Sequence, residues 1–549
     1  MVPASMARTV AVALSVATVG IVLFAAILPL TGIGDGAREV GFLHAAAGPS
    51  ASSPPNPFSS GMAASVAIGQ PTLTLANSGH GPQNLTVPQA GVTFDSHGDL
   101  WVSDTDNNRV LEYVPPFADG MSASVALGQA SLTGYLFNVT KSGLFEPRSI
   151  AFDASGDLWV VDAGSNRVVE FVPPFHTGMN ASLVLGQSGF TTGGPGTSST
   201  NFTGPSGIAF APGGDLVVSD AANNRLMIFD PPFTIGESAS LVIGQTTFLT
   251  HGAGTSATNL SDPWGLAIGP TGSVWVADDG NNRVLEFAPP FSDGMAASLV
   301  LGQTGYAANG SSLPDGMETP MGVGFDANED LWVAESGYNR MVEYLAPLTL
   351  GEMPSLVLGQ SSLAGSHGGT TAVNESRPSA VATDASGNLW VADTLNERVI
   401  EYAPPLYGVV VNETGVDSGD NWSVTFNGIP VVAIAPAVIS FSVPNGTYPF
   451  SAASLPGYVA SPSSGIKVVN GTAIRFTITF TLTLTPPVTT WGSWWWIVVV
   501  VVILAAALIL IAIWRRRRRG APAPGTTVPP GVTGGDSGVA PPVPPPGTT

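Results

Sequence analysis

The sequence predicts an all-β protein, a six-bladed β-propeller followed by a small β-sandwich, with a transmembrane helix near each end of the chain. Three observations predict it. A unit of about 58 residues recurs six times, the next stretch keeps alternating strands but loses the period, and two long apolar runs lie near the chain ends. A small sheet repeated in this way buries both of its faces only when neighbouring copies pack against it, as the blades of a propeller do.

The repeating unit is clearest between Pro147 and Gln187. Four short runs rich in Val, Ile, Leu, Phe and Trp lie within it, separated by Gly, Pro, Asn and Asp, which predicts four strands and three turns. The arginine that opens the third strand recurs at spacings of 58, 58, 58, 57 and 58 residues, as Arg109, Arg167, Arg225, Arg283, Arg340 and Arg398. Such regular periods indicate one repeated architecture.

The first and last copies of the unit are incomplete in complementary ways. The run Phe58 to Gln70 matches only a fourth strand, whereas Pro378 to Tyr402 supplies three strands and no fourth. The six fourth strands end in Gly-Gln, at Gln70, Gln129, Gln187, Gln245, Gln303 and Gln360. The N-terminal strand is therefore predicted to complete the last blade and close the ring, which removes the open sheet edges.

The motif GDLWVVDAGSNRVVEF, residues 156–171, resembles the NHL repeat, in which a strand ending Val-x-Asp is followed by Asn-Arg-Val opening the next strand. The resemblance covers about Pro57 to Leu406 and implies the same six-bladed propeller. Lyase and lactonase relatives of this broad family use channel-facing His, Glu, Asn or Asp, which find no counterpart on the inner strands here. No catalytic residue, metal or cofactor is therefore carried over.

The composition excludes two further classes of site. Cysteine is absent, so neither a disulfide framework nor a thiolate metal site is possible. The net charge is −21, and six of the 18 Lys and Arg residues are the repeat arginines. Nucleic acid is not an expected partner, because phosphate binding needs clustered cations, although some NHL-type propellers bind RNA.

Two apolar runs predict membrane attachment. Thr9 to Leu30 is long enough to cross a bilayer and is either an uncleaved signal anchor or a signal peptide. The run around Ile497 to Ile513 is flanked by tryptophans and followed by Arg515 to Arg519, which predicts a span whose arginine end is cytosolic. The predicted boundaries are 1–8 for a cytosolic N-terminus, 9–30 for the first span, 31–57 for a linker, 58–406 for the propeller, 407–486 for the sandwich, 491–514 for the second span and 515–549 for the cytosolic Arg cluster and Pro/Gly-rich disordered tail.

The stretch 407–486 alternates apolar and polar residues and carries Asn-Gly turn signals, which predicts a small β-sandwich of Ig-like size. Its segment SGDNWSVTFNG, residues 418–428, resembles Ig-like or PEGA-like modules that are common in archaeal cell-surface proteins. The resemblance implies an extracellular location for this part of the chain.

Two sets of residues follow the repeat. An acidic residue at the end of each second strand is expected to accept hydrogen bonds from the adjacent Asn-Arg loop and to lock its blade: Asp104, Asp162, Asp220, Asp278, Glu335 and Asp393. Asn-x-Ser/Thr triplets, which are candidate glycosylation sites or turn sequences, lie in the propeller and sandwich at Asn84, Asn138, Asn201, Asn259, Asn309, Asn374, Asn412, Asn421, Asn445 and Asn470.

The repeat breaks around the proline that opens each blade, at the expected mouth of the channel. The candidate ligand-binding residues there are Gln89, Glu146, Arg148, Asp262, Trp264 and Arg377. Arg148, Arg377 and Trp264 suit an anionic or sugar-like ligand through ion pairing and ring stacking, and a variable solvated rim is the alternative.

These features favour a membrane-tethered, extracellular propeller that is not an enzyme and that binds a glycan or protein of the cell envelope. An ectoenzyme, a lyase or hydrolase working at the channel mouth, is the first alternative. A surface sensor coupled to a cytosolic partner is the second.

Overall fold

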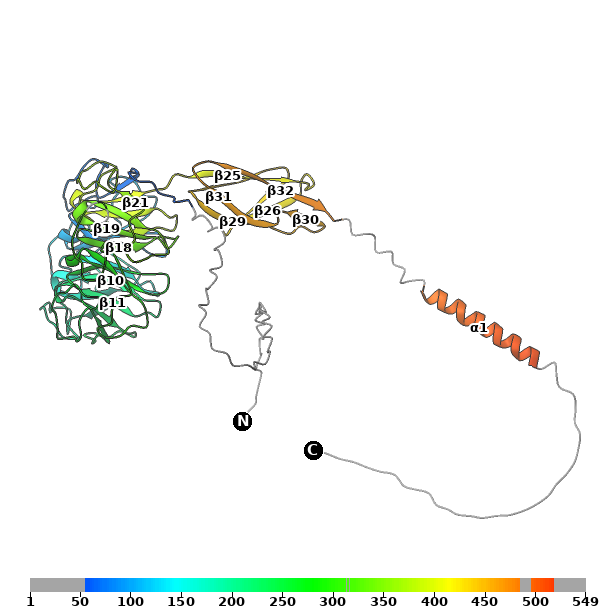
Figure 1. The fold of residues 1–549 in the computed structure, drawn as a ribbon, viewed down its shortest axis with the longest axis horizontal. Helices are drawn as coiled ribbons and strands as arrows, with labels where there is room; N and C mark the ends of the chain where they lie inside the picture. The colour runs from blue at the N-terminus through cyan, green and yellow to red at the C-terminus, as the bar shows by residue number, and fades with distance from the viewer. Residues whose placement is uncertain (1–54, 313, 315, 484–494, 518–549) are drawn as a thin grey trace, which may run out of the picture. The chain divides into compact units, whose positions relative to one another are not determined.

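The computed structural model describes residues 55–312, 314, 316–483 and 495–517 (Figure 1). The predicted first span, Thr9 to Leu30, and the tail after Arg517 lie outside the described residues. Six four-stranded antiparallel sheets form from residues 66–402, two four-stranded sheets form from residues 407–482, and one helix follows them within the described residues. The propeller, the sandwich and the helix are described one by one.

The six sheets of the propeller are numbered as blades 1 to 6 in chain order of their inner strands. The inner, second, third and outer strands are β2 (Pro88–Phe94), β3 (Leu100–Asp104), β4 (Arg109–Tyr113) and β5 (Val125–Leu127) in blade 1; β6 (Pro147–Phe152), β7 (Leu158–Asp162), β8 (Arg167–Phe171) and β9 (Leu183–Leu185) in blade 2; β10 (Pro205–Phe210), β11 (Leu216–Asp220), β12 (Arg225–Phe229) and β13 (Leu241–Ile243) in blade 3; β14 (Pro263–Ile268), β15 (Val274–Asp278), β16 (Arg283–Phe287) and β17 (Leu299–Leu301) in blade 4; β18 (Pro320–Phe325), β19 (Leu331–Glu335), β20 (Arg340–Tyr344) and β21 (Leu356–Leu358) in blade 5; and β22 (Pro378–Thr383), β23 (Leu389–Asp393), β24 (Arg398–Tyr402) and β1 (Val66–Ile68) in blade 6.

The ring closes as the sequence predicts. The N-terminal strand β1 pairs antiparallel with β24, with Val66 opposite Glu401 and Ile68 opposite Val399. The inner strands contact their neighbours in succession, and β2 of blade 1 contacts β22 of blade 6. The first strand in the sequence therefore completes the last blade, and the six-bladed propeller is confirmed.

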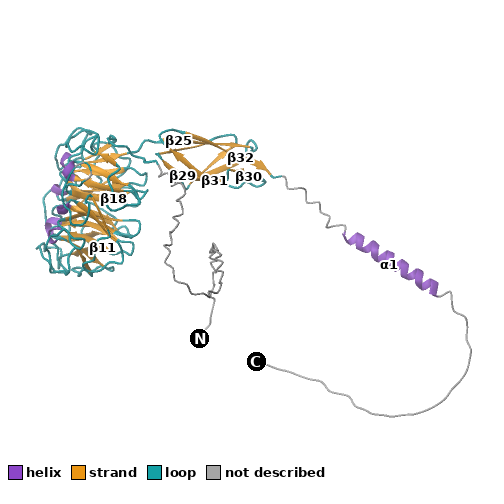
Figure 2. Cartoon of the chain, viewed as in Figure 1, coloured by secondary structure: helices purple, strands orange, loops and turns teal. Residues whose placement is uncertain are grey.

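The two faces of the propeller differ in their connections. A short 3-10 helix joins the second and third strands of every blade, and Figure 2 shows these helices along one side of the propeller. We call this side the loop face, and the side with the turns between inner and second strands the turn face. The six helices are η1 (Thr105–Asn107), η2 (Ala163–Ser165), η3 (Ala221–Asn223), η4 (Asp279–Asn281), η5 (Ser336–Tyr338) and η6 (Thr394–Asn396).

The core of the propeller lies between neighbouring blades. Trp101 of blade 1 is fully buried and packs edge-on against Phe152 and Phe175 of blade 2, with ring centroids 5.9 and 4.8 Å away. The same arrangement recurs where Trp159 of blade 2 meets Phe210 and Phe233. Each tryptophan thus buries its apolar area against the next blade, which explains why one blade cannot be stable alone.

The sandwich consists of β25 (Tyr407–Thr414), β26 (Asn421–Phe426), β27 (Ile429–Ile434), β28 (Ile439–Val443), β29 (Gly446–Ala452), β30 (Tyr458–Ser461), β31 (Ser464–Val469) and β32 (Ile474–Leu482). One sheet has the order β28-β25-β32-β30 and the other β27-β26-β29-β31. Alternating residues of both sheets, including the fully buried Trp422, form a single core. Strands β25 and β32 pair in parallel, which the strand pattern alone did not predict.

The helix α1 (Trp495–Arg517) is long and apolar enough to cross a membrane over Trp496–Arg516, with a mean hydropathy of 3.4. The 21 residues of Trp496–Arg516 correspond to about 31 Å at a rise of about 1.5 Å per residue, which is close to the thickness of the hydrocarbon core of a bilayer. The predicted span, 491–514, and the helix overlap, and the helix continues into the arginine cluster.

Candidate functional site

The loops on the loop face are held by buried charge pairs. In each blade the arginine that opens the third strand pairs through Nε with the acidic residue that ends the second, at 2.5–2.7 Å, and both side chains are fully buried. In blade 3, Asp220 also accepts the backbone N–H of Thr203 at 2.6 Å. The Nη groups of Arg225 donate to the carbonyls of Ser198 and Asn201, both at 3.0 Å. Each pair therefore fixes the loop that leads into its blade.

The chain enters each inner strand through a strained turn and a β-bulge. The residue before the blade-opening proline is left-handed in every blade, with φ of 52° at Glu146 and 49° at Asp262. Its N–H is donated to the preceding blade, as from Glu146 to Asn108 Oδ1 at 2.9 Å. All six inner strands then shift register behind the proline. A β-bulge changes the direction in which the neighbouring side chains point. The bulge in each inner strand therefore sets the direction of the side chains at the mouth.

Two of the predicted residues meet at the mouth. The guanidinium of Arg148, in blade 2, lies over the ring of Trp264, in blade 4, with Cζ 4.6 Å from the ring centroid. Trp264 is 8% exposed and Arg148 is half-buried. Arg148 Nε and Trp264 Nε1 are buried, and neither has a hydrogen-bond partner among the residues that the structure describes. The pair therefore holds two N–H donors whose hydrogen-bonding capacity is unused within the described part of the chain.

Opposite charges surround this pair. Burial lowers the pKa of Arg148, whereas the nearby carboxylates of Glu146 and Asp262 partly offset this by raising it. Burial raises the pKa of Asp279 to about 7, with a further contribution from Asp262, while Arg377 lowers it. Glu146 and Asp262 therefore lie close enough to Arg148 to affect its charge, and Asp262 and Arg377 lie close enough to Asp279 to do the same.

The remaining predicted residue, Gln89, lies half-buried on the inner strand of blade 1, and its backbone N–H donates to Thr105 Oγ1 at 3.2 Å. Among the described residues, no hydrogen bond or ion pair joins its side chain to the Arg148–Trp264 pair. Asp279, by contrast, was not predicted. Its position carries Thr, Ala, Ala, Ser and Thr in the other blades, so this break in the repeat was the signal that could have revealed it.

Inside the mouth, the channel contains a cavity of about 290 Å³. Its walls are small and apolar residues of the inner strands, such as Ala267, Gly322 and Ala380, with hydroxyls from Ser149 and Ser379. The surface of this cavity is mainly polar, so polar groups are found both inside the channel and at its mouth.

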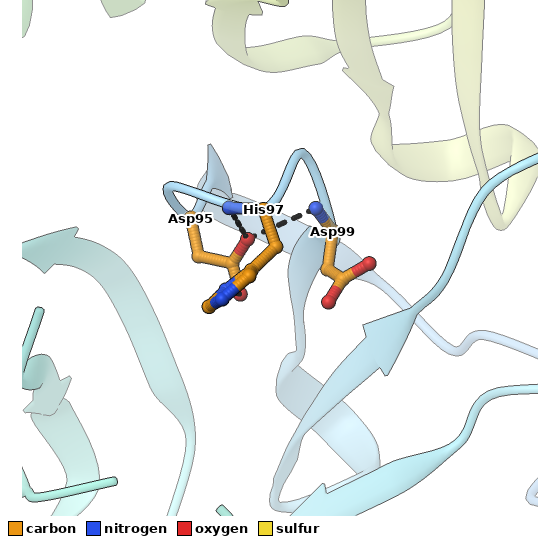
Figure 3. Close-up of side chains that lie close together, drawn as sticks. All are labelled: Asp95, His97 and Asp99. Atoms are coloured by element: carbon orange, nitrogen blue, oxygen red, sulfur yellow. Dashed lines mark hydrogen bonds and ion pairs between the residues drawn. The ribbon is translucent and has the colours of Figure 1, made fainter. Parts of the chain in front are cut away.

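The turn face carries acidic groups that the sequence reasoning did not single out. In blade 1, Asp95 Oδ1 accepts the N–H of His97 and of Asp99, at 2.8 and 3.0 Å (Figure 3). His97 Nδ1 lies 3.8 Å from Asp95 Oδ2, and its side chain is 82% exposed. These residues line a hollow of about 610 Å³ with Glu112 and Asp153. Similar groups of carboxylates lie in blades 2 and 5.

The ten asparagines of the Asn-x-Ser/Thr triplets differ in contacts and exposure, and six of them form two distinct groups. The side-chain amides of Asn201 and Asn374 donate to the carbonyls of Gly186 and Gly359, at 3.3 and 3.5 Å. These asparagines brace the loops, which gives a structural reason for their recurrence at the same place in the repeat. Four candidate asparagines are instead exposed: Asn138, Asn309, Asn421 and Asn470.

A family model described as "Phytase-like: Esterase-like activity of phytase" matches residues 200–309, about a fifth of the chain. No curated protein matches the chain. Among solved structures, the chain is similar to a streptogramin B lyase, at 12% identity over 59% of this chain and 95% of the lyase, with a TM-score of 0.36.

Two further solved structures are an auxiliary nutrient binding protein from Bacteroides ovatus and a gluconolactonase from Xanthomonas campestris. The first is 13% identical over 63% of this chain and 77% of its own, with a TM-score of 0.42. The second is 15% identical over 62% and 97%, with a TM-score of 0.38. They include enzymes and binding proteins alike, and similarity this low carries no argument about function. The fold assignment rests on the sheets described above.

Proposed function

We propose that this protein is a membrane-tethered binding module that holds a sugar unit of a cell-envelope glycan at the channel mouth. The observation that carries the proposal is the stacked Arg148–Trp264 pair, whose Nε and Nε1 donors are buried and without partners. Buried donors left unpaired cost free energy, which a ligand with hydroxyl or carbonyl oxygens recovers when it binds.

The charges at the mouth favour a neutral or weakly acidic sugar over a polyanion. Glu146, Asp262 and the partly ionised Asp279 offset Arg148 and Arg377. Sugar hydroxyls both donate and accept, so they match carboxylates and N–H groups in one place. The position of this group at the mouth, outside the channel cavity, suits the end or side of a chain and not a fully enclosed molecule.

The orientation in the membrane follows from the helix. The arginines at the end of α1 favour the cytosol for that end, and on this ground we propose that the propeller and sandwich lie outside the cell. We assign the repeats to the NHL type on their Asn-Arg motif, and the sandwich to the Ig-like or PEGA-like modules on its strand pattern. Both assignments agree with a protein of the cell surface.

The proposal is tested with the full-length protein in detergent micelles, titrated calorimetrically with neutral and acidic envelope oligosaccharides. Arg148→Lys and Trp264→Phe each remove one unpaired donor and keep most of the packing. Each is expected to weaken binding about tenfold or more, because a lost hydrogen bond in a buried site costs about 1 to 3 kcal/mol. Lys141→Gln, which removes the cation over Phe190, is the matched control and should bind like the wild type.

Binding that both donor variants leave unchanged would contradict the proposal. A specific observation favours a second candidate, the ectoenzyme, because Asp279 is a half-buried carboxyl at the mouth whose pKa of about 7 suits a general acid or base. In that case the same oligosaccharides or their esters would be turned over, and Asp279→Asn would stop turnover while binding persisted.

The exposure of each asparagine side chain decides which Asn-x-Ser/Thr triplets can carry a glycan. We expect attached glycans at Asn138, Asn309, Asn421 and Asn470 and not at Asn201 or Asn374, whose amide nitrogens are already hydrogen-bonded. Mass spectrometry of glycopeptides from membrane-extracted protein measures the occupancy of each site. Occupancy of Asn201 equal to that of Asn138 would contradict this expectation.

A further inference from the structure

The turn face of blade 5 holds three carboxylates in unusually close contact. An oxygen of Asp326, one of Asp330 and one of Glu343 all lie within 4.8 Å of one another. Asp330 is 8% exposed and Glu343 is fully buried. In blades 1 and 2 the corresponding groups retain more contact with solvent, so they can remain charged without a partner.

One carboxylate oxygen of this group has no partner. Glu343 Oε2 accepts from Ser355 Oγ at 2.7 Å and from Asn56 Nδ2 at 2.6 Å, but Glu343 Oε1 is buried and accepts no hydrogen bond from the described part of the chain. No Lys, Arg or His of the described residues forms an ion pair with any of the three carboxylates. Buried negative charge is stable only when it is paired or coordinates a metal.

Blade 6 shows what this position needs. There the residue equivalent to Asp330 is Asn388, and its Nδ2 donates to Asp384 Oδ2 and Glu401 Oε1, both at 2.9 Å. Glu401 Oε2 accepts from Ser65 Oγ, as Glu343 Oε2 does from Ser355. The repeat therefore directs Glu343 Oε1 toward residue 330, where blade 5 has a carboxylate in place of the amide donor.

We propose that Asp326, Asp330 and Glu343 bind a divalent cation, Ca²⁺ in preference to Mg²⁺. The cation replaces the positive end of the Asn388 amide and satisfies Glu343 Oε1. The donors are all carboxylate oxygens, which suit hard cations. They come from a turn and a neighbouring strand, an irregular set that Ca²⁺ accommodates better than the octahedral Mg²⁺. This site lies on the face opposite the channel mouth and does not depend on the proposed glycan binding.

The site also contacts the segment that closes the ring. Glu343 Oε2 accepts from Asn56, and Phe58, two residues later, packs edge-on against Trp332 at 5.2 Å between ring centroids. A cation that holds Glu343 therefore supports the segment leading into β1. Ca²⁺ is expected to raise the melting temperature of the propeller.

Terbium provides the test, because Tb³⁺ replaces Ca²⁺ and is excited by nearby indoles. Trp332 Nε1 donates to Asp326 Oδ2 at 3.3 Å, so Tb³⁺ bound here lies beside an antenna. Chelator-treated full-length protein in micelles is titrated with Tb³⁺ and then with CaCl₂ or MgCl₂. Wild-type protein is expected to show sensitised emission that Ca²⁺ displaces at lower concentration than Mg²⁺.

Asp330→Asn copies blade 6 and is expected to fold while losing one bound Ca²⁺ and the Ca²⁺-dependent rise in melting temperature. Asp157→Asn, in the solvated carboxylate group of blade 2, is the matched control and should keep both. Calorimetry with CaCl₂ alone counts the bound ions. Wild-type protein that binds no Ca²⁺, or an Asp330→Asn variant that binds as many ions as the wild type, would overturn the proposal. A proton shared between the carboxylates would then be the explanation for this buried group.

Discussion

Replacing Arg225 by Met is expected to destabilise the propeller by about 3 to 5 kcal/mol, the loss typical of breaking a buried charge pair. The substitution leaves the carboxylate of Asp220 fully buried without its cation. It also removes the donors to the carbonyls of Thr197, Ser198 and Asn201, which hold the loop entering blade 3. Unfolding by urea, followed by tryptophan fluorescence, measures the change in the unfolding free energy.

Two further variants separate the causes of that loss. Arg377 is exposed, so Arg377→Met should change the stability by less than about 0.5 kcal/mol. In the double variant Arg225→Met with Asp220→Leu, the stranded charge is gone but the carbonyls remain unpaired, so only part of the stability should return. A single Arg225→Met variant as stable as the wild type would contradict the role of these pairs in fixing the loops.

Replacing Glu375 by Leu is expected to stabilise the protein by about 1 to 4 kcal/mol at neutral pH, the gain typical of replacing a buried ionisable group by an apolar one. Glu375 is fully buried, and Oε2 has no partner. The five equivalent residues are apolar: Leu85, Leu144, Phe202, Leu260 and Met317. Leu is therefore already accommodated at this place in three blades.

The stabilisation expected from Glu375→Leu increases as the pH rises. Burial first, and then Asp393, raise the pKa of Glu375 from 4.5 to about 8, so the folded state binds a proton that the unfolded state releases above pH 4.5. This group therefore costs stability progressively as the pH rises from about 4.5 to about 8. Thermal melts across that range should show a smaller decline for Glu375→Leu than for the wild type.

Glu375→Gln is the isosteric control. It keeps an acceptor for the hydroxyl of Tyr402, which donates to Glu375 Oε1 at 2.7 Å, but it cannot ionise. Its stability should match the wild type at pH 5 and exceed it at pH 8. A Leu variant that is less stable than the wild type at both pH values would show that the Tyr402 hydrogen bond outweighs the buried charge.

The fold was predictable because the same pattern of strands and turns occurs six times in the sequence. The arginine spacing, the incomplete first and last copies and the alternating apolar residues together require a closed ring, and β1 pairs with β24 as expected. The parallel pairing of β25 with β32 was not predictable, because alternation identifies strands and not their partners.

The site was predictable in part. Departures from the repeat identified Arg148 and Trp264, but their contact depends on bulges and on packing across blade 3, which residue spacing does not show. Asp279 was not predicted because it directly follows Asp278, which is the acidic residue that recurs in every blade. Asp330 was missed because Asp and Asn look alike in a turn, although only the amide can donate to a neighbouring carboxylate.

Binding of a ligand at the Arg148–Trp264 pair is tested most directly by fluorine NMR. Full-length protein labelled with 5-fluorotryptophan at its 12 tryptophans is titrated with cell-envelope oligosaccharide, and Trp264→Phe assigns the signal of interest. The account predicts a saturable shift of the Trp264 signal while the signals of the interblade Trp101 and Trp159 stay unchanged. Binding that shifts other tryptophans and leaves Trp264 unaffected would contradict it.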